Sequence, residues 1–470
     1  MNRIERLIAS PLGALIARPW FDALVLGFFN HWFFPLSRLW AAADAANGSV
    51  EKFFAEVPMD PEPELQQRLG AVLSLFERRR RESLTADGLW EKSFFGDAAV
   101  AADALAKIER ERLDKRAALN AMRRKFAFVR RGREIASIRW ELASPIEIAA
   151  AYAKVVRHQK APFQPPERMP QVRESRKFPT DQGSNYWVRF ASPSATMADD
   201  VTARVLEPKN ADDAPTLIFL HGICVEFDHW HGMIDDVAEL ARLGIRVIRP
   251  EAPWHGRRTP AGGYGGEKFI GTMPFGSLQY FSAQIREAAV LIDWCRAHTS
   301  GPVAIGGSSL GAHVARLIAT RAADWPERLR PDALFLITPC GRLEDAAIDG
   351  AFAEVWKTVE NSARYGWTDE LRTKWFDLID PAENPVVAPE KTVAVLGSLD
   401  RVTPFPSGER LLERLGLPAE NTFIRRQGHF STPVNLVRDR APLHRFREVL
   451  RSPPSILRVD TEEATNVVAG

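Results

Sequence analysis

Short apolar runs alternate with longer stretches of helical periodicity over the last two thirds of the chain. A run without polar interruption is typical of a strand buried on both faces of a parallel sheet, and a period of 3.6 is typical of an amphipathic helix. The alternation predicts a doubly wound, mostly parallel α/β sheet with right-handed crossovers. The predicted strands are 216–220, 245–248, 303–305, 333–337, 392–396 and 422–424, and the predicted helices include 234–243 and 278–295.

Two further patterns add to this sheet. Alternating positions at 186–191 and 201–206 predict a pair of antiparallel strands joined by a polar turn. Between the strands at 333–337 and 392–396 lies a tract rich in Trp and Phe at helical spacing. We expect this tract to be a helical insertion, at about 341–390, that covers the carboxyl ends of the strands as a cap.

The first 160 residues show helical periodicity without a competing strand pattern, for example at positions 65, 69, 72, 73 and 76, and again at 119, 122, 126 and 129. Ser144 and Glu147 form a capping box with proline between them, which predicts a helix that starts there and runs to about residue 156. Five prolines among charged residues at 161–179 predict an extended connector that belongs to neither neighbour. The predicted organisation is an all-helical region at 1–160, this connector, and an α/β domain at 180–460.

Charge and cysteine content narrow the function classes. Residues 1–160 carry 26 Lys and Arg against 20 Asp and Glu, so this third is basic and the rest of the chain is mildly acidic. Acidic residues are interspersed among the basic clusters, which favours a solvated helix face over a nucleic-acid surface. The three cysteines are odd in number and widely spaced, without the pattern of a disulfide framework or a metal site. We expect a reducing, cytoplasmic location.

Residues 20–40 are rich in Trp, Phe and Leu. Asp22, Asn30, His31 and Pro35 interrupt the segment, which disfavours a membrane-spanning helix. Arg18 and Asp22 lie where the uninterrupted apolar core of a signal peptide would be, which disfavours a signal peptide. Two interpretations stay open at this point. The aromatic side chains either pack against the rest of the chain or a second copy of it, or contact a membrane surface peripherally, drawn to anionic lipid by neighbouring arginines.

The apolar run at 303–305 leads into the pentapeptide GSSLG at 307–311. This pentapeptide fits G-x-S-x-G, in which a serine lies on a tight strand-to-helix turn with its hydroxyl exposed. Glycine at both ends removes side chains that would strike neighbouring elements at such a turn. Apolar residues then recur at helical spacing, as the motif requires. We therefore predict Ser309 as a nucleophile.

A serine hydroxyl needs a histidine to accept its proton and a carboxylate to orient that histidine. Asp400 follows the predicted strand at 392–396, and His429 follows the next strand. Loops at the carboxyl ends of parallel strands converge on one rim of the sheet. Ser309, Asp400 and His429 are therefore the predicted catalytic residues.

The negative oxygen of a tetrahedral intermediate needs two N–H donors held in place. The backbone of Leu310, directly after the nucleophile, is the first predicted donor. The sequence His221-Gly222-Ile223 follows the first long buried strand, and its glycine allows close approach of the backbone. We predict the backbone of Ile223 as the second donor.

These motifs together resemble the α/β-hydrolase superfamily, on its esterase and lipase side, over roughly residues 180–450. The resemblance rests on Leu220-His221-Gly222, the turn at Ser309, Asp400 in GSLD and His429 in QGHFS. It implies a carboxylic ester or thioester substrate, acyl transfer to water through an acyl-serine intermediate, and no cofactor. The chain departs from the glycine-rich oxyanion motif of lipases, because Ile223 and Cys224 follow His221-Gly222.

Other hypotheses remain beside this one. A serine peptidase or amidase, or a catalytically silent binding module, could use the same scaffold. Arg257 or Arg258 could bind an anionic group of a substrate, although a structural role is favoured. The polar loop with Glu226, Asp228, His229 and His231 could hold a metal, but no second matching group follows, so no metal is expected.

Overall fold

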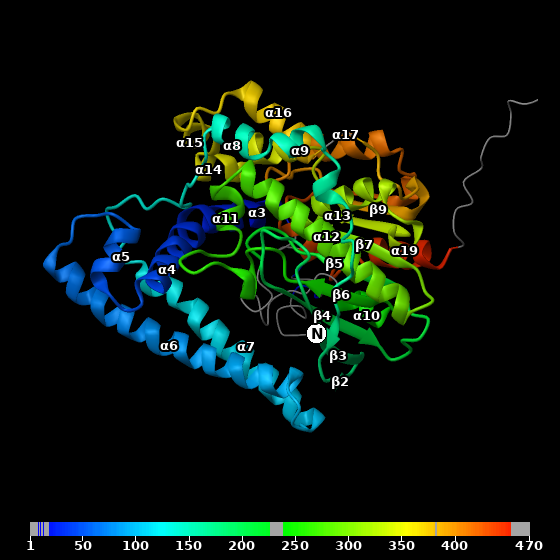
Figure 1. Ribbon diagram of the computed structural model, residues 1–470, viewed down its shortest axis with the longest axis horizontal. Coiled ribbons are helices and arrows are strands. Elements are labelled where there is room, and N and C mark those ends of the chain that lie inside the picture. Colours follow the sequence, from blue (N-terminus) through cyan, green and yellow to red (C-terminus); the bar gives the residue numbers. More distant parts are fainter. Residues whose placement is uncertain are drawn as a thin grey trace, which may run out of the picture.

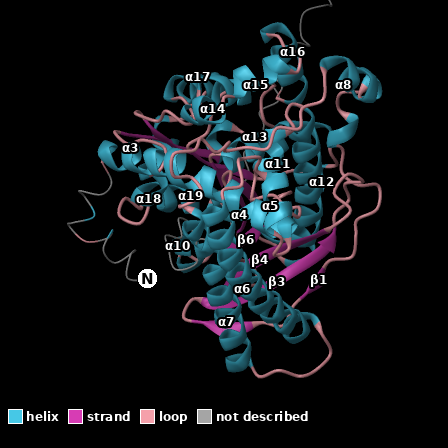
Figure 2. Ribbon diagram, turned by 90° about the vertical axis from the view of Figure 1, so that its left-hand side faces the viewer, coloured by secondary structure: helices cyan, strands magenta, loops and turns pink. Residues whose placement is uncertain are grey.

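One sheet runs through the molecule with helices on both of its faces (Figures 1 and 2). The computed structural model describes residues 18–225, 238–380 and 383–452 and the single residues 8, 10 and 13. The strands are β1 (Arg173–Glu174), β2 (Phe178–Thr180), β3 (Gly183–Ala191), β4 (Asp200–Pro208), β5 (Thr216–Leu220), β6 (Arg246–Pro250), β7 (Val303–Ser308), β8 (Ala333–Ile337), β9 (Thr392–Gly397) and β10 (Thr422–Arg425). Their order is β1-β3-β4-β6-β5-β7-β8-β9-β10, with β2 paired to β3.

The larger part of this sheet is parallel. Strands β6, β5, β7, β8, β9 and β10 pair in parallel, whereas β4 pairs antiparallel with both β6 and β3. The register places Ile218 of β5 opposite Ile248 of β6 and Ile305 of β7. The predicted mostly parallel α/β sheet is therefore confirmed, and each of the predicted apolar runs forms a strand.

Alternate residues of the strands face two separate layers of helices. Ile218 and Leu220 of β5 share a core with α12 (Phe275–His298) and α13 (Leu310–Arg321). Leu217 and Phe219 pack on the other face with α10 (Ala238–Arg242) and α19 (Ala441–Arg451). The predicted helix at 278–295 lies within α12. Of the predicted helix at 234–243, residues 234–237 lie outside the described residues.

The N-terminal part is helical, as predicted. Its helices are α3 (Pro19–Phe28), the π-helical turn η1 (Phe29–Phe33), α4 (Phe34–Ala46), α5 (Val50–Glu56), α6 (Pro63–Phe95), α7 (Ala102–Asn120), α8 (Pro145–Ala151) and α9 (Ala153–Arg157). The paired helices α6 and α7 lie at the lower left of Figure 1, and Trp90 and Phe94 of α6 pack against Phe178 of β2 and Trp187 of β3. Phe33, Phe34 and Ala41 lie in the same core as α12 and α13.

A buried ion pair also joins the two parts. Arg38 of α4 lies 3.0 Å from Glu267 Oε2 and 2.9 Å from Glu56 Oε2. Glu267 begins α11 (Glu267–Gly271), and its carboxylate also accepts a hydrogen bond from the N–H of Arg139. Burial raises the pKa of Glu267, against the opposing effect of Arg38. Removal of the Arg38 charge would leave the Glu267 carboxylate buried without its countercharge, which is strongly destabilising.

Three local expectations turn out differently. The helical spacing at 119–129 does not correspond to one α-helix: α7 ends at Asn120, and a 3₁₀-helix follows over Ala121–Phe126. The Ser144–Glu147 capping box is present, yet α8 ends at Ala151 and a separate α9 follows. The connector at 161–179 is not purely extended chain between neighbours, because β1 and β2 within it pair with β3. Proline is tolerated there because these strands lie at the sheet edge.

The insertion between β8 and β9 is helical. It contains the π-helical turn η7 (Asp345–Asp349) followed by α14 (Ala351–Trp356), α15 (Thr358–Arg364) and α16 (Asp369–Ile379). In Figure 1 these helices lie at the top, beside α8 and α9. Among the described residues, no helix combines the length and apolar character needed to cross a membrane.

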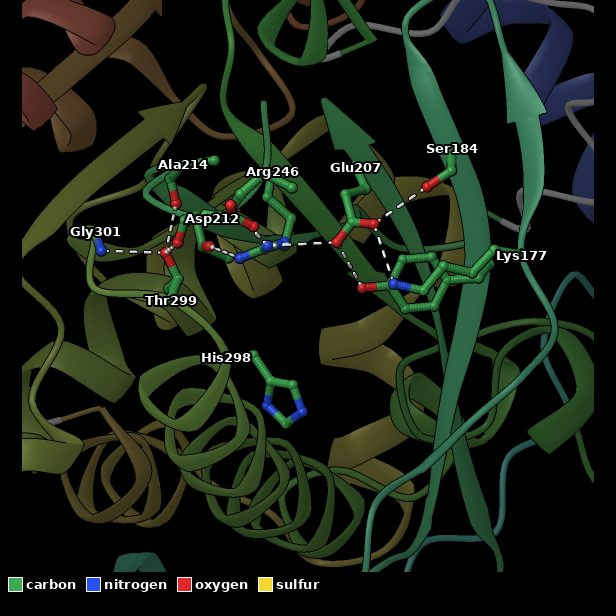
Figure 3. Close-up of polar contacts among 12 residues, drawn as sticks. Lys177, Ser184, Glu207, Asp212, Ala214, Arg246, His298, Thr299 and Gly301 are labelled. Atoms are coloured by element: carbon green, nitrogen blue, oxygen red, sulfur yellow. Dashed lines mark hydrogen bonds and ion pairs between the residues drawn. The ribbon is translucent and has the colours of Figure 1, made fainter. Parts of the chain in front are cut away.

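Polar side chains tie the antiparallel edge of the sheet to nearby loops (Figure 3). Arg246, at the start of β6, donates to Glu207 Oε1 of β4 at 3.3 Å, and Lys177 Nζ lies 3.1 Å from Glu207 Oε2. The Thr299 hydroxyl donates to the carbonyl of Ala214 at 3.0 Å. This network lies at the amino ends of the parallel strands. It therefore stabilises the sheet at the end of the strands opposite to the end at which Ser309 lies.

Candidate active site

Ser309 lies on the tight turn between β7 and α13. Its backbone has φ 57° and ψ −122°, a combination that is strained for a residue with a side chain. Added Cβ atoms at Gly307 and Gly311 would come within 2.7 Å and 2.1 Å of the carbonyl oxygen of Leu220. The two glycines are therefore required by the close approach of β5, and the turn raises the Ser309 hydroxyl above the sheet.

The structure brings the three predicted catalytic side chains into one hydrogen-bonded chain. His429 Nε2 lies 2.9 Å from Ser309 Oγ, and His429 Nδ1 lies 2.8 Å from Asp400 Oδ2. An ionised carboxylate only accepts hydrogen bonds, so the proton of the neutral ring belongs on Nδ1 and the free lone pair on Nε2. The ring is thus held in the tautomer that can accept the serine proton.

Asp400 is itself fixed by the turn that follows it. Its Oδ1 accepts hydrogen bonds from the N–H groups of Val402 and Thr403, at 2.8 and 3.0 Å. The Thr403 hydroxyl lies 2.9 Å from Asp400 Oδ2 and 3.2 Å from His429 Nδ1. Thr403 was not among the site residues predicted from the sequence. Its position three residues after an aspartate at the end of a strand is the local signal that could have indicated it.

The loop after β5 lies directly beside the serine. A Cβ atom added to Gly222 would approach Ser309 Cβ to 3.3 Å, so only glycine leaves the neighbouring space open. The N–H of Cys224 donates to His255 Nε2 at 3.3 Å, and Ile223 lies between Gly222 and Cys224 in the sequence. Leu310 is the first residue of α13, so its N–H lacks an acceptor within the helix. The two predicted oxyanion donors therefore belong to backbone segments that flank Ser309.

Comparison with known sequences gives the family. The sequence model of the Alpha/beta hydrolase family matches residues 217–456, which is more than half of the chain. The chain belongs to the alpha/beta hydrolase family. None of the curated proteins matches it.

Several solved structures are similar to this hydrolase. A cold-adapted esterase from an Arctic intertidal metagenomic library is 16% identical, with a TM-score of 0.37, over 59% of this chain and 98% of that chain. An S-formylglutathione hydrolase from Agrobacterium tumefaciens is 18% identical, with a TM-score of 0.40, over 58% of this chain and 98% of that chain. The acylaminoacyl peptidase of Pyrococcus horikoshii is 11% identical, with a TM-score of 0.35, over 63% of this chain and 41% of that chain.

Two buried histidines hold the loop beside the serine of this hydrolase. His221 Nδ1 lies 2.8 Å from the carbonyl of Gly222, and its Nε2 accepts from the N–H of Ala252 at 3.2 Å. His255 Nδ1 lies 2.9 Å from the carbonyl of Pro253, and its Nε2 accepts from Cys224. Burial lowers the pKa of His221 to about 4 and that of His255 to about 3. Both rings are therefore neutral at pH 7, and their Nε2 atoms accept hydrogen bonds from backbone N–H groups.

Because buried histidines with lowered pKa values stay neutral in the folded protein, we expect its free energy of unfolding to fall in acid. Burial also lowers the pKa of His313, to about 4. Below about pH 6.5 the unfolded chain binds protons at His221, His255 and His313 that the folded chain does not, so acidification favours unfolding. Each histidine is expected to remove about 2 kcal/mol of unfolding free energy between about pH 6.5 and pH 5. Urea unfolding at pH 7 and pH 5 measures this difference.

The matched variant for this prediction is His313→Gln, which keeps a polar side chain but cannot be protonated in this range. We expect its stability to fall less steeply with acidification than that of the unaltered protein. An equal dependence on pH in both proteins would show that His313 is not one of the groups responsible.

Arg257 and Arg258, which the sequence suggested as possible ligands of an anionic substrate group, both form ion pairs within the protein. Arg258 is buried between Asp199 and Glu287, with which it forms ion pairs of 2.9 and 2.7 Å. Arg257 pairs with Glu251 at 2.7 Å. These arginines are therefore occupied within the fold. The loop of Glu226, Asp228, His229 and His231 lies outside the described residues.

One contact to the catalytic loop comes from the far end of the sequence. Asp22 of α3 accepts hydrogen bonds from the N–H groups of Phe430 at 2.7 Å, Ser431 at 3.0 Å and Gly428 at 3.2 Å. The Ser431 hydroxyl also donates to Asp22. In the sequence Asp22 interrupts an apolar segment, and no local pattern indicates this long-range contact.

Proposed function

We propose that this protein is a serine hydrolase that cleaves a carboxylic ester or thioester through an acyl-serine intermediate. Ser309 acts as the nucleophile, His429 as general base and then general acid, and Asp400 orients the imidazole. The observation that carries the proposal is the hydrogen-bonded chain from Ser309 Oγ through both ring nitrogens of His429 to Asp400. This arrangement is the one that activates a serine for attack on a carbonyl carbon.

In the first half of the reaction, Ser309 Oγ attacks the carbonyl carbon while its proton passes to His429 Nε2. The Asp400 carboxylate stabilises the imidazolium that forms. The tetrahedral intermediate then collapses: the bond from carbon to the leaving group breaks, and His429 Nε2 gives its proton to the departing oxygen or sulfur. The product of this half is an ester between the acyl group and Ser309.

In the second half, a water molecule takes the place of the leaving group. His429 removes a proton from the water as its oxygen attacks the acyl carbon, and the second tetrahedral intermediate releases Ser309 Oγ. The proton returns from His429 to the serine oxygen. The carboxylic acid leaves, and the starting protonation states are restored.

The backbone N–H groups of Leu310 and Ile223 are the donors that we assign to the oxyanion in both halves. Gly222 and the two histidines that bind the backbone on either side of Ile223 support this assignment, because they fix the loop next to Ser309. Donors fixed in advance of the reaction need no reorganisation as charge develops, which is the source of their effect on rate.

Aromatic side chains next to His429 support an apolar acyl or alcohol group in the substrate. The Phe430 ring stacks on Phe29 at a centroid distance of 5.3 Å, and Phe352 lies 6.2 Å from Phe430 and 5.8 Å from Phe29. Phe29 and Phe430 are only partly buried. A surface of this kind favours hydrocarbon over charged groups.

A fluorophosphonate probe and a substrate series test the proposal together. We expect the probe to label Ser309 and p-nitrophenyl esters of graded chain length to be hydrolysed, with matched thioesters and anilides assayed alongside. Hydrolysis of anilides at rates equal to esters would favour the amidase alternative. Absence of labelling and of all hydrolysis would favour the silent binding module and refute the proposal.

A further inference from the structure

The carboxylate of Asp22 lies directly beneath the loop that carries His429 (residues 428–431). It accepts hydrogen bonds from Gly428 and Phe430, the residues on either side of His429, and from both the N–H and the hydroxyl of Ser431. Figure 2 shows α3 next to α18 (Ser431–Asn435), the helix that this loop begins.

The fit between the carboxylate and the loop is tight. A Cβ atom added to Gly428 would come within 2.4 Å of Asp22 Cγ, so this position accepts only glycine while Asp22 remains in place. The stacked rings of Phe29 and Phe430 form a second contact between the same helix and the same loop. Hydrogen bonds from neutral donors to an ionised acceptor are stronger than those between neutral groups.

We propose that Asp22 is a positioning residue, which holds the 428–431 loop so that His429 Nε2 meets Ser309 Oγ. Catalysis depends on the distance between nucleophile and base, and a displacement of about 1 Å can cost on the order of 10²-fold in rate. The N-terminal helical part thereby supplies a component of the active site. This inference rests on the proposed function for its effect on rate, but not for its effect on the loop.

The test uses Asp22→Asn in the full chain. An amide of the same shape has lost the charge and one acceptor oxygen, and its NH₂ group would face donors of the loop. We expect kcat to fall by about ten- to a hundredfold and KM to change less, because Phe430 moves with the loop whereas Phe29 and Phe352, the other two rings of the apolar surface, lie outside it. We also expect faster hydrogen exchange of the amides at 428–431.

The matched control is Asp44→Asn. Asp44 is also an N-terminal aspartate that accepts a hydrogen bond from a distant glycine, Gly262, at 3.3 Å, and it does not contact the 428–431 loop. If Asp22→Asn changed neither exchange nor kcat more than Asp44→Asn does, the proposal would be wrong. Faster exchange with unchanged kcat would also overturn it. An active Ser309→Ala protein would instead refute the proposed function, whatever the exchange data show.

The face of α3 opposite to Asp22 carries a row of exposed apolar side chains that continues onto η1. Trp20, Leu24, Phe28 and Trp32 are spaced four residues apart on α3 and η1, and each is exposed to between 50% and 62%. We call these four side chains the exposed ridge. Side chains of this size at this spacing form a continuous apolar surface, which a monomeric protein in water rarely presents without a binding role.

Basic residues adjoin one end of the exposed ridge. Trp32 lines a shallow surface hollow together with Arg130, Arg131 and Arg133. Glu134 borders the same hollow, but its carboxylate is paired with Lys357 at 2.8 Å. Arg133 pairs with Glu62. The hollow therefore presents more positive than negative charge next to exposed aromatic rings.

We infer that the exposed ridge and this basic hollow bind the surface of an anionic lipid bilayer. Tryptophan and phenylalanine side chains insert at the level of the lipid head groups, and each arginine near an anionic surface adds electrostatic attraction. Since the inner face of α3 contacts the His429 loop, binding would hold the candidate active site close to the lipid. This second inference does not depend on hydrolytic activity.

Co-sedimentation with vesicles tests it. We expect the full chain to bind vesicles of phosphatidylglycerol and phosphatidylcholine, to bind phosphatidylcholine alone more weakly, and to lose binding at high salt. The variant Leu24→Ser/Trp32→Ser is expected to bind at least about tenfold more weakly, because it loses two of the four inserted apolar side chains.

The control variant is Leu84→Ser/Leu89→Ser, which removes two similarly exposed leucines of α6, 58% and 48% accessible, that lie outside the ridge. It is expected to bind as the unaltered protein does. Failure of the full chain to bind anionic vesicles would overturn the inference, as would equal binding by the two double variants. Self-association that is lost only in Leu24→Ser/Trp32→Ser, without vesicle binding, would assign the ridge to a second copy of the chain instead.

Discussion

Replacement of Ser309 by alanine is expected to abolish nearly all hydrolysis and leave the protein folded. Loss of a triad member typically costs on the order of 10⁶ in turnover, because nucleophile and base act as a unit. The strained backbone at this residue, with φ 57°, accommodates alanine no worse than serine. Steady-state hydrolysis of the best ester substrate and thermal unfolding of the variant measure the two outcomes.

The neighbouring serine provides the control. Ser308 is the last residue of β7 and differs from Ser309 by one step along the chain. Ser308→Ala should retain most activity and remain labelled by the fluorophosphonate probe. An inactive Ser308→Ala protein together with an active Ser309→Ala protein would show that the assignment of the nucleophile is wrong.

Replacement of His429 by alanine is expected to have an effect of the same order, about 10⁶ in turnover. Without the imidazole, Ser309 has no group at 2.9 Å to accept its proton, and Asp400 has no ring to orient. Turnover by His429→Ala is measured beside that of His221→Ala and His255→Ala. The last two should retain more activity, because their rings bind backbone groups rather than the serine.

The same three histidine variants can also contradict the assignment of His429 as general base. If His221→Ala or His255→Ala lost as much activity as the serine variant while His429→Ala stayed active, the proposed general base would be incorrect. We do not expect that outcome, because only the His429 ring is hydrogen-bonded to Ser309, whereas the rings of His221 and His255 bind backbone groups.

Much of the fold could be predicted because it depends on local patterns. The strand at 303–305 and the glycines around Ser309 leave few conformations open, since the turn needs small residues and the parallel sheet needs uninterrupted apolar runs. Asp400 and His429 could be proposed because both follow predicted strands, and the ends of neighbouring strands converge. The structure places all three within hydrogen-bonding reach, while their catalytic roles remain a proposal.

Other features depend on contacts that no local pattern encodes. No local pattern at Tyr152 predicts that α8 ends there and α9 begins. The prolines of the 161–179 connector disfavour strands, and β1 and β2 form there because they pair with β3. The aromatic residues of 20–40 also allowed two interpretations. In the structure Phe29 faces the protein and Trp32 faces solvent, so the segment divides between packing and exposure.

The contacts of α3 and α4 also bear on how the chain folds during synthesis. Asp22 and Gly428 are 406 positions apart, and Arg38 and Glu267 are 229 positions apart. Loops of this length must close before such contacts form, so this docking is expected to be a late and slow step. Until α12, α13 and α14 have left the ribosome, Phe33 and Phe34 have no core to enter. The N-terminal helices are thus the part of the newly made chain that most needs protection from aggregation, although they are synthesised first.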